Sequence, residues 1–148
     1  MSKRIIRVAP EVLSLLTLLG TILFLIIYWK HIPEQVPTHF DGAGQVTAWG
    51  DKTTVLILPI VGAVSYLLLT GCNAFVSVMQ KNELPPSAPL CLSVFKLLLL
   101  VPFAVITVYS ALAKPLPGWF TPVSIILPFI PITVLVVLAL RWEATRRR

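Results

Sequence analysis

Charged residues are scarce in this sequence. Only 12% of its 148 residues are charged and 57% are hydrophobic, whereas soluble domains have about 25% charged and about 45–50% apolar residues. So few charges cannot cover the surface of a water-soluble protein of this length, and much of the surface must therefore face lipid. The length favours a single membrane domain, residues 1–148, with no appended soluble catalytic domain.

Motifs for catalysis and cofactor binding are also missing. The sequence contains no glycine-rich phosphate loop, no HExxH and no CxxC. These motifs are typical of phosphate binding, zinc binding and thiol redox chemistry. Its two cysteines, Cys72 and Cys91, lie near the ends of neighbouring apolar runs. We interpret them as small apolar side chains, and we expect no cofactor.

Four apolar runs are long enough to cross a bilayer core of about 30 Å, for which a helix needs about 20 residues. They cover residues 12–29, 55–78, 90–113 and 122–140. The sequence therefore predicts an all-α membrane protein, a four-transmembrane-helix bundle. An ordered extracytoplasmic loop, residues 30–53, is expected between helices 1 and 2.

The distribution of basic residues predicts the orientation. One side holds nine Lys and Arg residues and the other holds three, and the richer side is expected to be cytoplasmic, with both termini on it. The nine are Lys3, Arg4, Arg7, Lys81, Lys96, Arg141, Arg146, Arg147 and Arg148, and the three are Lys30, Lys52 and Lys114. Because the net charge of +6 gathers at the ends of apolar runs, it favours lipid headgroups as partners and argues against nucleic acid.

Polar and small residues follow one face of each predicted span, which is typical of helix–helix packing in a bilayer. The faces carry Ser14, Thr17 and Thr21 in the first span; Gly62, Tyr66, Thr70, Asn73 and Ser77 in the second; Lys96, Thr107 and Ser110 in the third, where Phe103 shares the face; and Thr121 and Ser124 in the fourth. Pro128 and Pro131 are expected to kink the last helix.

Lys96 lies inside the third predicted span, about 9 Å from its start at 1.5 Å per residue. We interpret it first as a side chain that snorkels back to the cytoplasmic surface. It shares a face with Thr107 and Ser110, however, so the alternative is that it points into the bundle. Asn73 is then the nearest plausible partner by depth, and such an intramembrane polar pair is a candidate functional site.

The predicted outer loop contains the residues of a folded connection. Pro33 and Pro37 favour an extended entry, and Asp41 with Gly44 favours a tight turn. A connection longer than about 12–15 residues is usually functional or disordered, and this composition favours order. We interpret His39 as hydrogen-bonding the loop backbone and Asp41 as capping the turn.

The stretch "IPEQVPTHFDGAGQVTAWGDK" resembles the loop motif of a family of small bacterial membrane proteins, a domain of unknown function found in SdpI-type immunity proteins. The resemblance covers about residues 28–58, and its motif positions are Pro33, Val36, Pro37, His39, Phe40, Gly44, Trp49, Gly50 and Lys52. Thr47 stands where the family usually has an Asp. The resemblance implies a bacterial cytoplasmic (inner) membrane protein with an immunity or receptor role.

The leading hypothesis is therefore non-enzymatic recognition of a peptide or envelope component by the outer loop. The candidate ligand-binding residues are Pro37, His39, Phe40, Asp41, Gly44, Trp49 and Lys52. One alternative is a small transporter or lipid-handling protein with a cavity near Asn73 and Lys96; four helices are few for a carrier, so it would need a homo-oligomer. Another is a metal-dependent hydrolase using His39 and Asp41, for which the metal-ligand spacing is missing.

Overall fold

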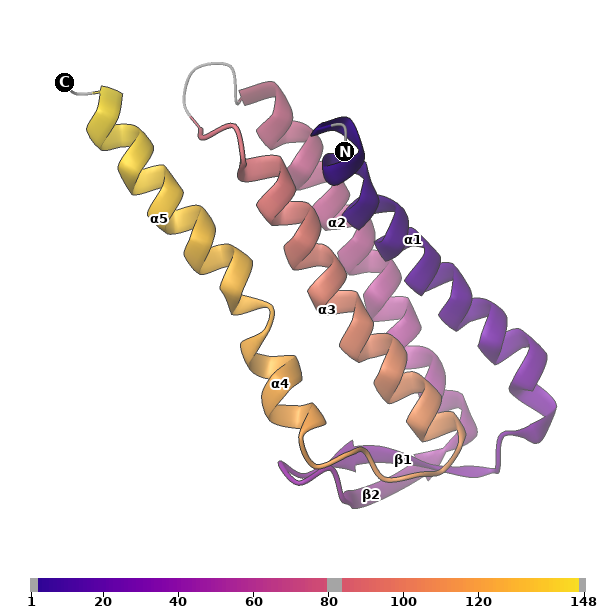
Figure 1. Ribbon diagram of the computed structural model, residues 1–148. Coiled ribbons are helices and arrows are strands. Elements are labelled where there is room, and N and C mark those ends of the chain that lie inside the picture. The colour runs from indigo at the N-terminus through magenta and orange to yellow at the C-terminus, as the bar shows by residue number, and fades with distance from the viewer. Residues whose placement is uncertain (1–2, 80–83, 147–148) are drawn as a thin grey trace.

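The computed structural model describes residues 3–79 and 84–146 (Figure 1). Lys81, Arg147 and Arg148, which entered the charge count, lie outside the described residues, as do the side chains of Lys3, Arg4, Arg7 and Arg146. The elements in chain order are α1 (Lys3–Tyr28), η1 (Trp29–His31), β1 (Gln35–Phe40), β2 (Val46–Asp51), η2 (Lys52–Leu56), α2 (Ile57–Met79), α3 (Ala88–Ala111), α4 (Phe120–Ile126) and α5 (Phe129–Arg146).

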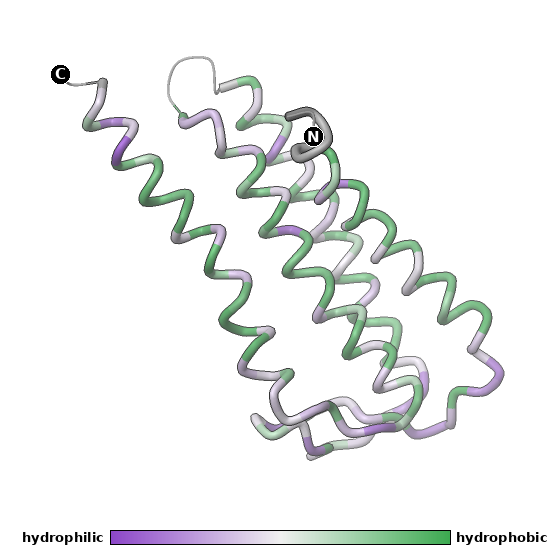
Figure 2. Tube along the Cα trace, viewed as in Figure 1, coloured by the Kyte–Doolittle hydropathy of each residue, from purple (hydrophilic) through white to green (hydrophobic). Residues whose placement is uncertain are grey.

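The expected fold class is confirmed, because the chain is mostly helical and has four helical segments long and apolar enough to cross a membrane. These are Val8–His31, Lys52–Val78, Ala88–Ala111 and Phe120–Thr145. Hydrophobic residues run along the helices, whereas hydrophilic ones gather where the hairpin lies (Figure 2). The protein is therefore described as a multi-pass membrane protein.

Helix α3 is the centre of the bundle. It packs extensively against both α1 and α2 and also contacts α5, whereas α1 and α2 contact each other much less. The two ends of the bundle differ. The start of α1, the end of α2, the start of α3 and the end of α5 lie at one end, and the strands β1 and β2 lie at the other with the connection from α3 to α4 (Figure 1).

The fourth span is two helices, not the single helix expected over residues 122–140. Helix α4 ends at Ile126 and α5 begins at Phe129, with a turn at Leu127 and Pro128. A proline inside a helix removes one backbone hydrogen bond and clashes with the preceding turn, so the kink expected at Pro128 is confirmed. Pro131 lies in the first turn of α5, where the missing N–H has no helical partner to lose.

The connection between the first two spans is a β-hairpin, an element that the all-α expectation did not include. β1 and β2 pair antiparallel from Gln35↔Asp51 to Phe40↔Val46, with register shifts on either side of His39. The extended entry favoured by the prolines is thus a strand, and the return is a second strand. On which side of the membrane the hairpin lies stays a prediction from charge.

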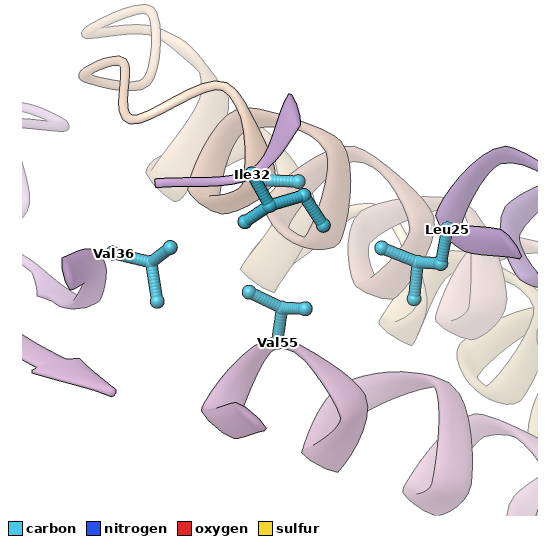
Figure 3. Packing of buried hydrophobic residues seen from close by; sticks show 5 residues of the cluster. Leu25, Ile32, Val36 and Val55 are labelled. Atoms are coloured by element: carbon cyan, nitrogen blue, oxygen red, sulfur yellow. The ribbon is translucent and has the colours of Figure 1, made fainter. Parts of the chain in front are cut away.

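A small apolar core joins the hairpin to the helices. Val36 in β1 is completely buried and clusters with Leu25, Ile32, Val55 and Ala111. Figure 3 shows Ile32, Val36 and Val55 gathered around a common space, with Leu25 beside them. Burying such side chains contributes roughly 1.5–3 kcal/mol each, so the hairpin is held against the ends of the bundle.

Candidate functional site

The hairpin turn is built around the carboxylate of Asp41. Its Oδ1 accepts hydrogen bonds from the backbone N–H groups of Ala43 (2.9 Å) and Gln45 (2.8 Å). The backbone N–H of Asp41 donates to the Gln45 carbonyl at 2.9 Å, and that of Gly44 donates to the Asp41 carbonyl at 3.0 Å. Asp41 therefore caps the turn, as the sequence predicted.

The turn docks on the connection between α3 and α4. The N–H of Leu116 donates to the Gly44 carbonyl at 2.8 Å, and the Thr121 hydroxyl donates to the Asp41 carbonyl at 3.4 Å. Gly44 has φ +80°, and a Cβ atom placed on it would lie 2.3 Å from the Leu116 carbonyl oxygen. Only glycine fits this position without displacing the backbone.

Beneath the docked hairpin lies a pocket of about 720 Å³. Its walls come from β1, from the first turns of the second span, from the end of α3 and from α4. Three of the predicted ligand-binding residues line it, namely Pro37, His39 and Phe40. Segments far apart in the sequence thus enclose one hollow next to the loop motif.

The other predicted ligand-binding residues lie outside the pocket lining. Asp41 and Gly44 form the adjacent turn, as described above. Trp49 is exposed, and the Lys52 Nζ lies over the Trp29 ring, 5.0 Å from its centroid. The structure therefore does not bring all seven candidates together into one site.

Among the residues that the structure describes, the lining of this hairpin pocket includes no Lys, Arg, Asp or Glu side chain. Most of its hydroxyl groups donate to nearby backbone carbonyls, which leaves their protons unavailable to a ligand. These bonds run from Thr54 to Asp51, from Thr107 to Phe103, from Thr121 to Asp41 and from Ser124 to Phe120. The pocket lining is thus mainly apolar, with a few hydroxyl groups and the His39 ring.

Two polar groups of the pocket are available to a ligand. Within residues 3–79 and 84–146, the Ser110 hydroxyl has no hydrogen-bond partner, although its residue is 5% exposed. The His39 ring contacts the hydroxyl of Thr38, with Nδ1 3.3 Å from Oγ1, not the loop backbone as we expected. Ser110 was recognised in the sequence only as part of a packing stripe, because nothing local signals that a helical serine meets a distant hairpin.

A second polar site lies near the other end of the bundle, around Lys96. The side chain of Lys96 is 1% exposed and forms an ion pair with Glu11 of α1. Its Nζ also donates to the Thr70 hydroxyl at 2.8 Å and lies 4.5 Å from the centroid of the Tyr66 ring. The snorkelling interpretation of Lys96 is therefore wrong: the charge is enclosed in the bundle, where a partner offsets its desolvation.

Asn73 and Ser93 complete this cluster on the same carboxylate. Oε1 of Glu11 accepts from Asn73 Nδ2 at 2.9 Å and from the Ser93 hydroxyl at 2.7 Å. Asn73 is thus near Lys96 in depth, as expected, but it bonds to Glu11 and to Ser93 (2.8 Å). We call Glu11, Tyr66, Thr70, Asn73, Ser93 and Lys96 the polar clasp, since these residues join α1, α2 and α3.

The sequence did not single out Glu11, which precedes the apolar run of residues 12–29. Helix α1 begins at Lys3, so Glu11 lies two turns inside it and level with Lys96. The position of Lys96 could have indicated an acidic partner, because a lysine deep in an apolar span needs a compensating charge. Glu11 is an acidic residue close enough to a predicted span to supply that charge.

The described residues offer the metal-dependent alternative no ligand set. Within the described part of the chain, no group of three or more His, Cys, Asp or Glu side chains could hold a metal ion. One oxygen of Asp41 already accepts two backbone hydrogen bonds. Lys96 is enclosed by its partners, and neither it nor Asn73 lines the hairpin pocket.

Comparison with known proteins adds a family-level result for one part of the chain. Residues 16–63 match the model of a domain of unknown function (DUF1648). The match covers the second half of α1, the whole hairpin and the first turns of α2, and it does not reach α3. No curated protein and no solved structure matches the chain. The chain is therefore similar to an uncharacterised domain over the segment that carries the hairpin.

Proposed function

We propose that this protein is a non-enzymatic membrane receptor that recognises a peptide or an envelope component in the hairpin pocket. The observation that carries the proposal is the pocket of about 720 Å³ beneath β1, which His39 and Phe40 line. Ligand pockets of proteins are concave, mostly apolar and supplied with a few polar groups that fix orientation. The hairpin pocket meets that description, and we identify no catalytic set around it.

The lining favours an apolar peptide over an anionic ligand. A phosphate or carboxylate would need basic side chains or free N–H donors, and the lining offers neither Lys nor Arg. Backbone N–H groups of a peptide could donate to hydroxyl oxygens whose protons are already used, such as those of Thr107 and Ser124. Ser110 and His39 supply the remaining hydrogen-bonding capacity.

We place the protein in the bacterial cytoplasmic membrane, with both termini in the cytoplasm and the hairpin outside. The excess of Lys and Arg on the side of the termini supports this orientation. The pocket then opens where a secreted peptide first meets the membrane. The resemblance of the loop motif to SdpI-type proteins supports an immunity role, in which the ligand is a toxic peptide.

Protection of a sensitive bacterium by this protein tests the proposal. Cells that produce the wild-type chain, Phe40→Ala or His39→Ala are exposed to a panel of purified secreted membrane-active peptides. We expect the wild type to protect against at least one peptide and both variants to lose that protection at equal protein levels. Gln45→Ala serves as the control, because Gln45 is an exposed residue of the hairpin turn outside the pocket lining. Full protection by both pocket variants would contradict the proposal.

The polar clasp supports a second candidate function, transport through a homo-oligomer. An ion pair between membrane-spanning helices is a recurrent element of proton and ion pathways. Proton flux into liposomes that contain the purified protein, followed with a trapped pH-sensitive dye, tests this candidate. Flux that disappears in Glu11→Gln with Lys96→Met supports transport, whereas no flux by the wild type removes it.

A further inference from the structure

A second hollow lies on the outer side of the bundle, between α1 and α2. Because these helices both pack on α3 and contact each other little, a groove of about 560 Å³ opens between them. Its walls are apolar, with Ile22 and Ile26 on one side and Ile60 and Ala63 on the other. Ile26 and Ile60 are 69% and 61% exposed, so in a bilayer the groove faces the acyl chains.

The mouth of the groove carries a positive charge. Trp29 lines the groove at the hairpin end, and the ammonium group of Lys52 lies 5.0 Å from the centroid of its ring. Within residues 3–79 and 84–146, Lys52 forms no ion pair, although Glu34 and Asp51 are acidic residues of the same region. The ammonium donors are therefore free, while the cation–π contact holds the Lys52 side chain against Trp29, a residue of the groove wall.

We infer that this groove binds one anionic phospholipid, with an acyl chain between α1 and α2 and the phosphate at Lys52. Hydrocarbon suits the walls, because every lining side chain other than Trp29 is aliphatic and has no group that could pair with a polar ligand. A free cation at the membrane interface selects a negative headgroup over a zwitterionic one. The site is separate from the hairpin pocket, from which it differs in walls and in charge, so this inference stands apart from the proposed function.

Fluorescence of Trp29 reports directly on the groove. Trp49, Trp119 and Trp142 are replaced by Phe, and the protein is placed in nanodiscs of phosphatidylcholine. A small fraction of the lipid is brominated phosphatidylglycerol in one sample and brominated phosphatidylcholine in the other. We expect the brominated anionic lipid to be enriched about five-fold at Trp29, the effect of one interfacial cation on a headgroup.

Matched variants test the contact with the lipid headgroup and the contact with the acyl chain separately. Lys52→Gln should reduce quenching by the anionic lipid to the level of the zwitterionic one, whereas Lys114→Gln, which removes a charge from the connection after α3, should not. Ala63→Leu should fill the groove and lower quenching by both lipids. Equal quenching of Trp29 by the two lipids, in the protein with Lys52, Lys114 and Ala63 unchanged, overturns the inference. A dimer in which a second copy covers the groove and shields Trp29 from both lipids overturns it as well.

Discussion

The two polar regions of the molecule differ in how their hydrogen-bonding groups are used. In the polar clasp, Lys96 and Glu11 pair with each other and form hydrogen bonds with neighbouring side chains, and among the described residues only the Asn73 Oδ1 atom is buried without a partner. In the hairpin pocket, by contrast, Ser110 and His39 line a hollow of about 720 Å³ and have no such set of partners. Polar groups that satisfy one another stabilise a bundle, and polar groups left open at a cavity are available to a ligand.

This difference suggests a division of roles along the bundle axis. The clasp fixes how α1, α2 and α3 pack, because a charge in a membrane-spanning helix restricts the register to the one in which its partner is at the same level. The hairpin adds a wall made of β-structure at the opposite end, and the pocket lies between that wall and the helices. The predictions below test these roles separately.

The largest effect is expected from Lys96→Met. The substitution leaves the Glu11 carboxylate without its counter-charge, and removing one partner of a buried ion pair costs about 3–5 kcal/mol. Because the Glu11 side chain is 29% exposed, we expect about 3 kcal/mol. Unfolding by SDS titration in micelles measures this loss.

The double variant Glu11→Gln with Lys96→Met is the control for that change. Gln keeps an oxygen that can accept from Asn73 and Ser93, and no charge is left unpaired, so most of the lost stability should return. A single variant as stable as the wild type would show that the ion pair does not hold the helices.

A smaller effect is expected at the hairpin turn from Gly44→Ala. The new Cβ would meet the Leu116 carbonyl oxygen at 2.3 Å, at a backbone φ of +80°, and such strain with a clash costs roughly 2–3 kcal/mol. Because the hairpin must move to relieve it, amide hydrogen exchange should accelerate in β1 and β2. Gly42→Ala has nothing within 4 Å of its added Cβ and should leave exchange unchanged; similar exchange in both variants would argue against the docking of the turn.

The smallest effect is expected from Ser110→Ala. The hydroxyl has no partner within the described residues, so its loss should leave the free energy of unfolding nearly unchanged. If it bonds a ligand, its loss should weaken binding by about 1 kcal/mol, or roughly five-fold. Affinity for whichever peptide the wild-type protein protects against measures this. Thr133→Ala is the control, because its hydroxyl proton is used inside α5 and Thr133 lies outside the pocket lining. Unchanged affinity for Ser110→Ala would remove this serine from the site.

The helical part of the fold could be read from the sequence because the bilayer imposes it. Apolar runs of about 20 residues have one stable conformation in lipid, and Pro128 marked the break in the last span. The hairpin was harder to predict. β1 contains a proline and both short strands alternate weakly, and Val36 becomes buried only through contacts with Leu25 and Val55 of other elements.

The candidate sites were predicted only in part for the same reason. His39 and Phe40 were identified from the loop itself, whereas Ser110 reaches the same pocket from a helix about seventy residues further along the chain. The partner of Lys96 was missed because Glu11 is 85 residues away in sequence and precedes the apolar run of its helix. Local patterns give the type of each residue, and only the tertiary arrangement gives its neighbours.

Protection of cells against the peptide, compared between two variants that are shown to fold, tests the division of roles most directly. Phe40→Ala changes only the pocket wall, and Glu11→Gln with Lys96→Met changes only the clasp. We predict that the clasp double variant, once shown to be folded by circular dichroism and gel filtration, protects cells as the wild type does, whereas Phe40→Ala does not. Protection that survives Phe40→Ala and is lost in the folded clasp variant would contradict the account and place the function at the ion pair.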